Sequence, residues 1–136
     1  MIATGRPVPQ PSLESKEFWE GCRQGKLLMQ HCNPCGKINW FPRTYCAFCA
    51  AESFTWKETK GTGVLETFSV VYRPMSEAWQ SEVPYAIAIV RLTEGVRMVT
   101  RLIAREGRQP RFDAPVRVLF VKVSDEFQIP FFEETD

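Results

Sequence analysis

CNPC at residues 32–35 and CAFC at residues 46–49 are two Cys-x-x-Cys pairs separated by ten residues. Pairs at this separation can bring four thiolates to the corners of one tetrahedron. Zn²⁺ favours that geometry and binds thiolate sulfur at about 2.3 Å. Gly36 allows a tight turn after the first pair, so that backbone amides can point back at the sulfurs. Because four thiolates leave no open position for water, we expect one structural zinc, with these ligands: Cys32, Cys35, Cys46 and Cys49.

Two other interpretations of the cysteines are open. Disulfides would need an oxidising compartment, but the N-terminal stretch MIATGRPVPQP lacks the apolar core of a signal peptide. The longest uninterrupted apolar stretch, residues 85–90, is too short to span a bilayer. We therefore expect a cytoplasmic protein with reduced thiols. Iron in a rubredoxin-type site is the main competitor of zinc, because the same tetrahedron of sulfurs accepts it. Cys22 lies outside both pairs and is expected to be a packed thiol.

Charge is nearly balanced, with 17 basic and 16 acidic side chains and a net charge of +1. A nucleic-acid-binding protein usually has a clear basic excess. Residues 91–122 nevertheless carry eight basic side chains against three acidic ones. This local excess could receive a phosphorylated cofactor, or it could be the solvent face of ordinary strands. The acidic residues Glu133, Glu134 and Asp136 are expected to form a solvated tail.

The first half of the chain predicts an arm, one short helix and a three-stranded ribbon. Residues 1–11 are rich in proline and should be extended. Ser12 or Ser15 can cap a helix that runs to about Gln24 and stops at Gly25. Strands are expected at residues 26–30 and 38–41 and around Phe54 and Trp56. A ribbon of this size has little core of its own and depends on its metal.

The second half predicts a mainly β fold. Strands are expected at residues 64–72, 85–92, 96–103, 116–123 and 129–132, with a hairpin turn at Thr93-Glu94-Gly95. Five strands with one tight hairpin suit a small closed barrel of the OB type. The predicted domains are an arm and helix at residues 1–25, a zinc ribbon at 26–60 and an OB-fold barrel at 61–136. The long connection at residues 73–84 contains Met75 and Trp79, which could dock a partner or fold back over the barrel.

No catalytic residues are predicted. The only histidine, His31, directly precedes a presumed metal ligand and suits packing or a contact around the metal site. A hydrolase or acyl-transfer enzyme needs a nucleophile beside a base, and no G-x-S-x-G, P-loop or G-x-G-x-x-G motif occurs. If the protein takes part in catalysis, we expect the nucleophile to belong to another chain.

An ordered series of motifs resembles one known family across most of the chain. The series comprises Phe18-Trp19, Gly25-Lys26-Leu27, Cys32-x-x-Cys35-Gly36, Phe41-Pro42-Arg43, Cys46-x-x-Cys49, Gly61-x-Gly63, Pro84-Tyr85 and Glu94-Gly95-Val96-Arg97. It is similar to the acyl-CoA-associated family that joins N-terminal helices and a rubredoxin-like zinc ribbon to an OB-fold. One departure is Ala47, where a proline often follows the first cysteine of the second pair, and it does not threaten the metal site.

The resemblance implies a non-catalytic accessory subunit that docks on a thiolase-like catalytic subunit and can contact CoA. An acyl-CoA hydratase, aldolase or acyltransferase is the alternative partner, and a single-stranded nucleic-acid-binding OB protein is the alternative of another class. The expected docking residues are Phe18, Trp19, Met75 and Trp79. The expected CoA contacts are Arg91, Arg97 and Arg101, because Arg97 and Arg101 share one strand face and Arg91 lies on the preceding strand of the hairpin.

Overall fold

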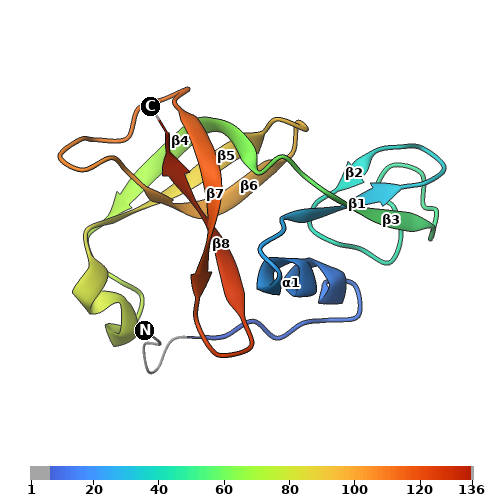
Figure 1. Cartoon of the computed structure of the whole chain (residues 1–136), viewed down its shortest axis with the longest axis horizontal. Coiled ribbons are helices and arrows are strands. Elements are labelled where there is room, and N and C mark those ends of the chain that lie inside the picture. The colour runs from blue at the N-terminus through green and yellow to red at the C-terminus, as the bar shows by residue number, and fades with distance from the viewer. Residues whose placement is uncertain (1–6, 136) are drawn as a thin grey trace.

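The computed structural model describes residues 7–135 and shows a helix, a small ribbon and a barrel (Figure 1). Helix α1 spans Lys16–Arg23, and the ribbon consists of β1 (Leu28–Cys32), β2 (Ile38–Asn39) and β3 (Phe54–Glu58). The ribbon is antiparallel with the order β2-β1-β3, so β1 lies in its centre. The predicted three-stranded ribbon is therefore present. Residues 1–6 of the predicted arm and Asp136 lie outside the described residues.

Helix α1 begins after Ser15, which is one of the two predicted caps. It ends at Arg23, close to the predicted end at about Gln24. The Ser15 side chain makes no capping bond to the helix. Its hydroxyl instead accepts the backbone N–H of Ser12 at 2.9 Å, which closes the turn in front of the helix. Within residues 7–135, no helix has the length and apolar character needed to cross a membrane.

The second half of the chain forms a closed five-stranded barrel. Its strands are β4 (Thr62–Val71), β5 (Tyr85–Leu92), β6 (Arg97–Ile103), β7 (Pro115–Lys122) and β8 (Gln128–Glu134). They close in the order β4-β5-β6-β8-β7, and only β6 and β8 pair in parallel. The period-2 pattern sets the inner face of the barrel, because alternate residues such as Met98 and Leu102 on β6 point into the core. The predicted OB-type barrel is confirmed. The long connection before β5 contains a short 3-10 helix, η1 (Glu77–Glu82).

One hydrophobic core joins the three parts. Phe132 and Leu65 from the barrel belong to the same buried cluster as Met29 from the ribbon and Phe18 and Cys22 from α1. In Figure 1, α1 lies between the ribbon and the long β7–β8 hairpin. The Gln128 side-chain amide at the start of β8 donates to the backbone carbonyl of Cys22 at 2.9 Å. The predicted domain boundaries after residues 25 and 60 therefore remain a proposal, because the hydrophobic core crosses both of them.

The predicted acidic tail is wrong for the residues described. Glu133 and Glu134 belong to β8, where Glu134 pairs in register with Val116 of β7. The Glu133 carboxylate lies 2.7 Å from the Arg117 guanidinium, and the largely buried Glu134 carboxylate lies 3.8 Å from Arg111. These arginines offset the acidic charge, so the chain continues as a strand at a point where composition alone indicated solvent.

Candidate metal centre

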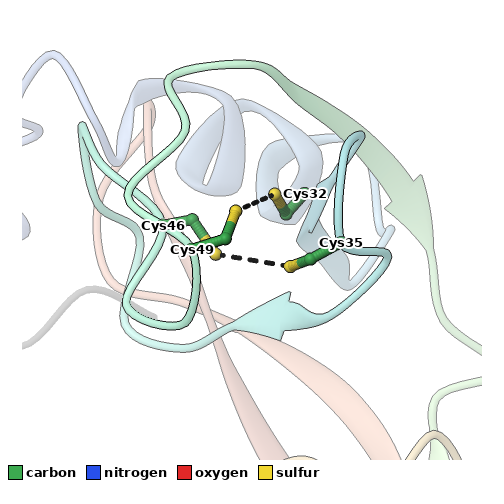
Figure 2. A group of neighbouring side chains, drawn as sticks. All are labelled: Cys32, Cys35, Cys46 and Cys49. Carbon is green, nitrogen blue, oxygen red and sulfur yellow. Dashed lines mark hydrogen bonds between the residues drawn. The ribbon is translucent and has the colours of Figure 1, made fainter.

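The four paired cysteines point toward one another from the end of β1 and the loops that follow β1 and β2 (Figure 2). Their sulfur atoms all lie within 4.8 Å of one another. The Cys32 and Cys49 sulfurs are 3.4 Å apart, and the Cys35 and Cys46 sulfurs are 3.7 Å apart. Each close pair thus takes one sulfur from each Cys-x-x-Cys turn. In a tetrahedral zinc site, sulfurs at about 2.3 Å from the metal are about 3.8 Å from one another. The cluster therefore fits a tetrathiolate metal ion, and all five cysteines are free of disulfide bonds.

The two Cys-x-x-Cys turns repeat one backbone conformation. The Gly36 N–H donates to the Cys32 carbonyl at 2.8 Å, and the Ala50 N–H donates to the Cys46 carbonyl at 2.9 Å. Both donors have a left-handed backbone, with φ of 75° at Gly36 and 65° at Ala50. The expectation that Gly36 turns the chain is met, although its own amide bonds a carbonyl oxygen and not a sulfur. Ala50 adopts the same left-handed conformation as Gly36, although its Cβ atom makes that conformation unfavourable.

The Cys46 sulfur receives the best-defined hydrogen bonds of the cluster. Its donors are the side-chain amide of Asn39 and the backbone N–H of Phe48, each at 3.4 Å. Burial raises the pKa of the Cys46 thiol, but these donors and the Cys49 backbone outweigh burial and lower the pKa to about 6. Cys46 is thereby prepared to act as a thiolate. Sequence reasoning missed Asn39, whose only signal is an amide between two apolar residues in a short strand.

The remaining cysteine and the histidine stand apart from this cluster. Cys22 is fully buried on α1, and burial raises the pKa of its thiol to about 12, so it is the packed thiol that was expected. His31 lies on β1 but is not a member of the four-cysteine group. Burial lowers the pKa of His31, and the nearby positive charge of Lys57 lowers it further. Its imidazole is therefore neutral at pH 7.

The three predicted CoA-contacting arginines do not form a single cluster. Arg91 and Arg97 face each other across the β5–β6 hairpin, and both bond the carboxylate of Glu66, at 3.2 Å and 2.6 Å. Glu66 reaches them from a β-bulge in β4. Arg101 lies about 13 Å further along β6, and its guanidinium is 2.7 Å from the carboxylate of Glu82 in η1. The structure thus brings Arg91 and Arg97 together and places Arg101 apart from them.

Arg101 has surroundings of a different kind from the other two. Its guanidinium lies over the Tyr85 ring at 4.6 Å and near the Phe131 ring at 5.5 Å. Burial lowers its pKa, and Tyr85 acts in the opposite direction. The side chain is 14% exposed and ties η1 to the barrel wall through Glu82.

The four predicted docking residues also differ in their positions. Phe18 is 3% exposed and packs in the core, 4.9 Å from the Trp40 ring, whereas Trp19 is partly buried and contacts Phe127. Met75 is fully exposed in the connection before η1. Trp79 is half-buried on η1, with its ring 6.4 Å from that of Tyr85. Phe18 therefore offers little surface to a partner, and the other three offer more.

An apolar groove of about 510 Å³ opens where helix, ribbon and barrel meet. It is lined by α1 and the residues before it, by ribbon residues 40–42, by residues 98–101 of β6 and by residues 129–131 of β8. Phe41 and Val99 on its walls are 65% and 64% exposed. Arg101 belongs to the same wall and links the groove to η1. Sequence reasoning did not predict this groove.

A tetrathiolate ribbon packed on a closed five-stranded barrel defines a zinc-ribbon/OB-fold protein. Two family models match the chain in succession: the ChsH2 rubredoxin-like zinc ribbon domain at residues 19–55 and the ChsH2 C-terminal OB-fold domain at residues 56–121. The chain therefore belongs to the ChsH2 (DUF35) family of zinc-ribbon/OB-fold proteins. The match to the zinc ribbon family and the cluster of four cysteines together support one structural zinc.

Curated relatives include both a hydratase subunit and scaffold proteins. A probable enoyl-CoA hydratase alpha subunit from Thermomonospora curvata is 29% identical over 93% of this chain, which spans 39% of that relative's length. A DUF35 domain-containing scaffold protein from Methanothermobacter thermautotrophicus is 29% identical over 74% of this chain and 75% of its own length.

Solved structures share the same architecture. A chain of a structure described as an Ltp2-ChsH2(DUF35) aldolase superposes with a TM-score of 0.84 at 28% identity, covering 93% of this chain and 98% of that one. A DUF35-family protein of unknown function from Sulfolobus solfataricus superposes with a TM-score of 0.62 at 16% identity, over 91% of this chain and 87% of its own. At that identity the second match shows the fold alone.

Proposed function

We propose that this chain is a non-catalytic, zinc-binding accessory subunit of an acyl-CoA enzyme complex and that it docks on a thiolase-type catalytic subunit. The apolar groove at the junction of helix, ribbon and barrel carries this proposal. Exposed apolar side chains such as Phe41 and Val99, gathered around one groove, are typical of surfaces that another protein covers. The neighbouring η1 connection, with Met75 and Trp79, extends the same docking surface past Arg101.

The zinc has a structural role in this proposal. Cys32, Cys35, Cys46 and Cys49 would hold it as four thiolates, which leaves no position for a substrate or water. These cysteines would tie the two Cys-x-x-Cys turns together through the metal, and would so keep Trp40 and Phe41, which lie between the turns in sequence, in the groove wall. The ribbon thus presents one wall of the docking surface.

The chemistry of the side chains supports a non-catalytic role. Four of the five thiols belong to the metal cluster, and the fifth, on Cys22, is buried with a raised pKa. His31 is the single histidine of the chain and lies on the ribbon. A nucleophile paired with a base, as acyl transfer requires, would then have to come from the partner.

The relatives favour a second candidate for the partner. Their descriptions include an enoyl-CoA hydratase alpha subunit and an Ltp2-ChsH2(DUF35) aldolase, so a hydratase or aldolase chain is the alternative to a thiolase-type chain. An acyltransferase chain would suit the same surface. A net charge of +1 argues against a single-stranded nucleic-acid-binding role.

CoA contact is proposed for the two arginines that lie together. Arg91 and Arg97 carry two positive charges against the single carboxylate of Glu66. The remaining charge is exposed and could pair with a phosphate that approaches the β5–β6 hairpin. Arg101 is more enclosed and is proposed to hold η1 in place for docking.

Co-purification from the native host, with mass spectrometry of the accompanying chains, tests this function. We expect a thiolase-type chain, and the isolated accessory chain should not turn over any acyl-CoA thioester. Recovery of a hydratase or aldolase chain would replace the thiolase-type assignment. Turnover by the isolated chain that His31→Ala abolishes would overturn the accessory role.

Substitutions in the docking surface test its location. Trp19→Ala and Trp79→Ala should each weaken the complex by about 2 kcal/mol, as at interface hot spots, with zinc content unchanged. Phe112→Ala is the matched control, because Phe112 is an exposed aromatic that stacks on Phe68 and does not line the groove. Both tryptophan variants binding the catalytic chain like wild type would show that the surface is misplaced.

A further inference from the structure

Asn39 differs from the other side-chain amides of the ribbon. Gln30 bonds the backbone of Arg43 in both directions, at 2.7 Å and 3.0 Å, and Asn33 bonds the hydroxyls of Ser53 and Thr55. Outside the four cysteines themselves, Asn39 donates a side-chain hydrogen bond to a cysteine sulfur, that of Cys46. It is also the most buried of the three amides, at 1% exposed.

The two ends of the Asn39 amide meet partners of opposite character. Its Oδ1 accepts the Ala47 backbone N–H at 2.8 Å, and its Nδ2 donates to the Cys46 sulfur at 3.4 Å. The Ala47 contact fixes the orientation, because a reversed amide would set one N–H against another and an oxygen against the sulfur. A thiolate is a good acceptor for this N–H, whereas a protonated thiol accepts weakly.

Burial makes this donor important to Cys46. Cys35 and Cys49 lie nearer the surface than Cys32 and Cys46, which are both buried. Cys46 is buried, and a thiolate held away from water needs fixed N–H donors. Asn39 and Phe48 supply two of them, and the Asn39 donor is the one that shortening a side chain removes.

We propose that Asn39 is a positioning residue of the metal site, which places the second Cys-x-x-Cys turn and stabilises the Cys46 thiolate, and thereby sets how tightly the metal is retained. The inference rests on the proposed ligation of zinc by the four cysteines. Wild-type zinc content tests that ligation separately: a wild-type chain without bound metal refutes the ligand set, whereas effects confined to Asn39 variants concern the positioning role.

Competition with a chelator measures the predicted effect on the full chain. Asn39→Ala should lower zinc affinity by about 10-fold to 100-fold, the usual range for residues that orient metal ligands. Asn39→Asp keeps an acceptor for Ala47 but sets a carboxylate against the sulfur, so its loss should be larger. Asn33→Ala is the control, since it removes two ribbon hydrogen bonds without touching a sulfur and should keep zinc close to the wild-type affinity.

A second readout distinguishes an effect at the sulfur from general loosening. In the Co²⁺-substituted protein, Asn39→Ala should shift the sulfur-to-metal charge-transfer bands, and Asn33→Ala should not. In the iron-substituted protein, loss of the N–H donor should lower the reduction potential, because the donor stabilises the reduced site, which carries more negative charge on its sulfurs, more than the oxidised site.

Three outcomes would overturn the proposal. The first is wild-type zinc affinity and unshifted spectra in both Asn39 variants. The second is equal losses in Asn39→Ala and Asn33→Ala. The third is a failure of both Asn39 variants to fold at saturating zinc, judged by circular dichroism, because Asn39 would then be an ordinary packing residue of the ribbon.

Discussion

At the scale of single residues, the gathering of four cysteines could be predicted, and the groups that support them could not. The cysteine spacing alone brings four sulfurs to one point, because a Cys-x-x-Cys turn has few conformations that serve a metal. Asn39 gave no comparable signal, since its role depends on the ladder that sets β2 beside β1 at Gln30. Ala50 was also missed. Its left-handed conformation follows from the repeat of the Gly36 turn, which appears only in the backbone.

Ala50→Gly should stabilise the protein. A Cβ atom at φ of 65° is disfavoured, and glycine removes that cost, so the free energy of unfolding should rise by about 1 kcal/mol. Denaturant unfolding of the zinc-loaded chain measures it. Ala51→Gly is the control and should be neutral or destabilising, because Ala51 is not among the residues with positive φ. A lower stability of Ala50→Gly would contradict the argument.

At the scale of elements, alternation predicted the strands well but not all of their ends. The prediction for β5 matches at both ends because its neighbours β4 and β6 pair with most of its length. β1 starts two residues later than predicted and continues through Cys32, since its ladder with β3 runs from Leu28 to Cys32. β8 continues into acidic residues that pair across to β7. Those ends depend on partners distant in sequence, which local patterns do not contain.

The ribbon should depend on its metal more than the barrel does. Cys35→Ser should lose the single zinc and unfold the ribbon, because β1–β3 have little core of their own. Metal analysis and circular dichroism measure the two effects. Cys22→Ser is the contrasting control: it buries a hydroxyl in the core and should cost about 1–3 kcal/mol of stability while one zinc per chain remains. Retention of zinc by Cys35→Ser would refute the assignment of that ligand.

At the scale of the whole molecule, the surfaces depend on how the parts meet. The groove needs α1, the ribbon and the splayed parts of β6 and β8, which pair only at Leu102 and Ile103. Arg101 meets a different carboxylate from Arg97, that of Glu82, which η1 brings to the barrel wall. Sequence spacing placed the arginines on one face but could not show which carboxylates they meet. Functional surfaces were therefore less predictable than the strands that carry them.

The arginines give a prediction for the assembled complex. Arg97→Ala should weaken CoA binding and make it less dependent on salt, because one phosphate contact and its released counterion are lost. Arg91→Ala should act in the same direction, since both side chains share Glu66. Arg101→Ala should instead lower the affinity for the catalytic chain, because η1 loses its link to the barrel. Calorimetry of CoA binding at several salt concentrations, with Arg108→Ala as a control from a different loop, measures these effects. CoA affinity unchanged at low salt in both Arg91→Ala and Arg97→Ala would mean that these side chains serve only to keep Glu66 and the hairpin in place.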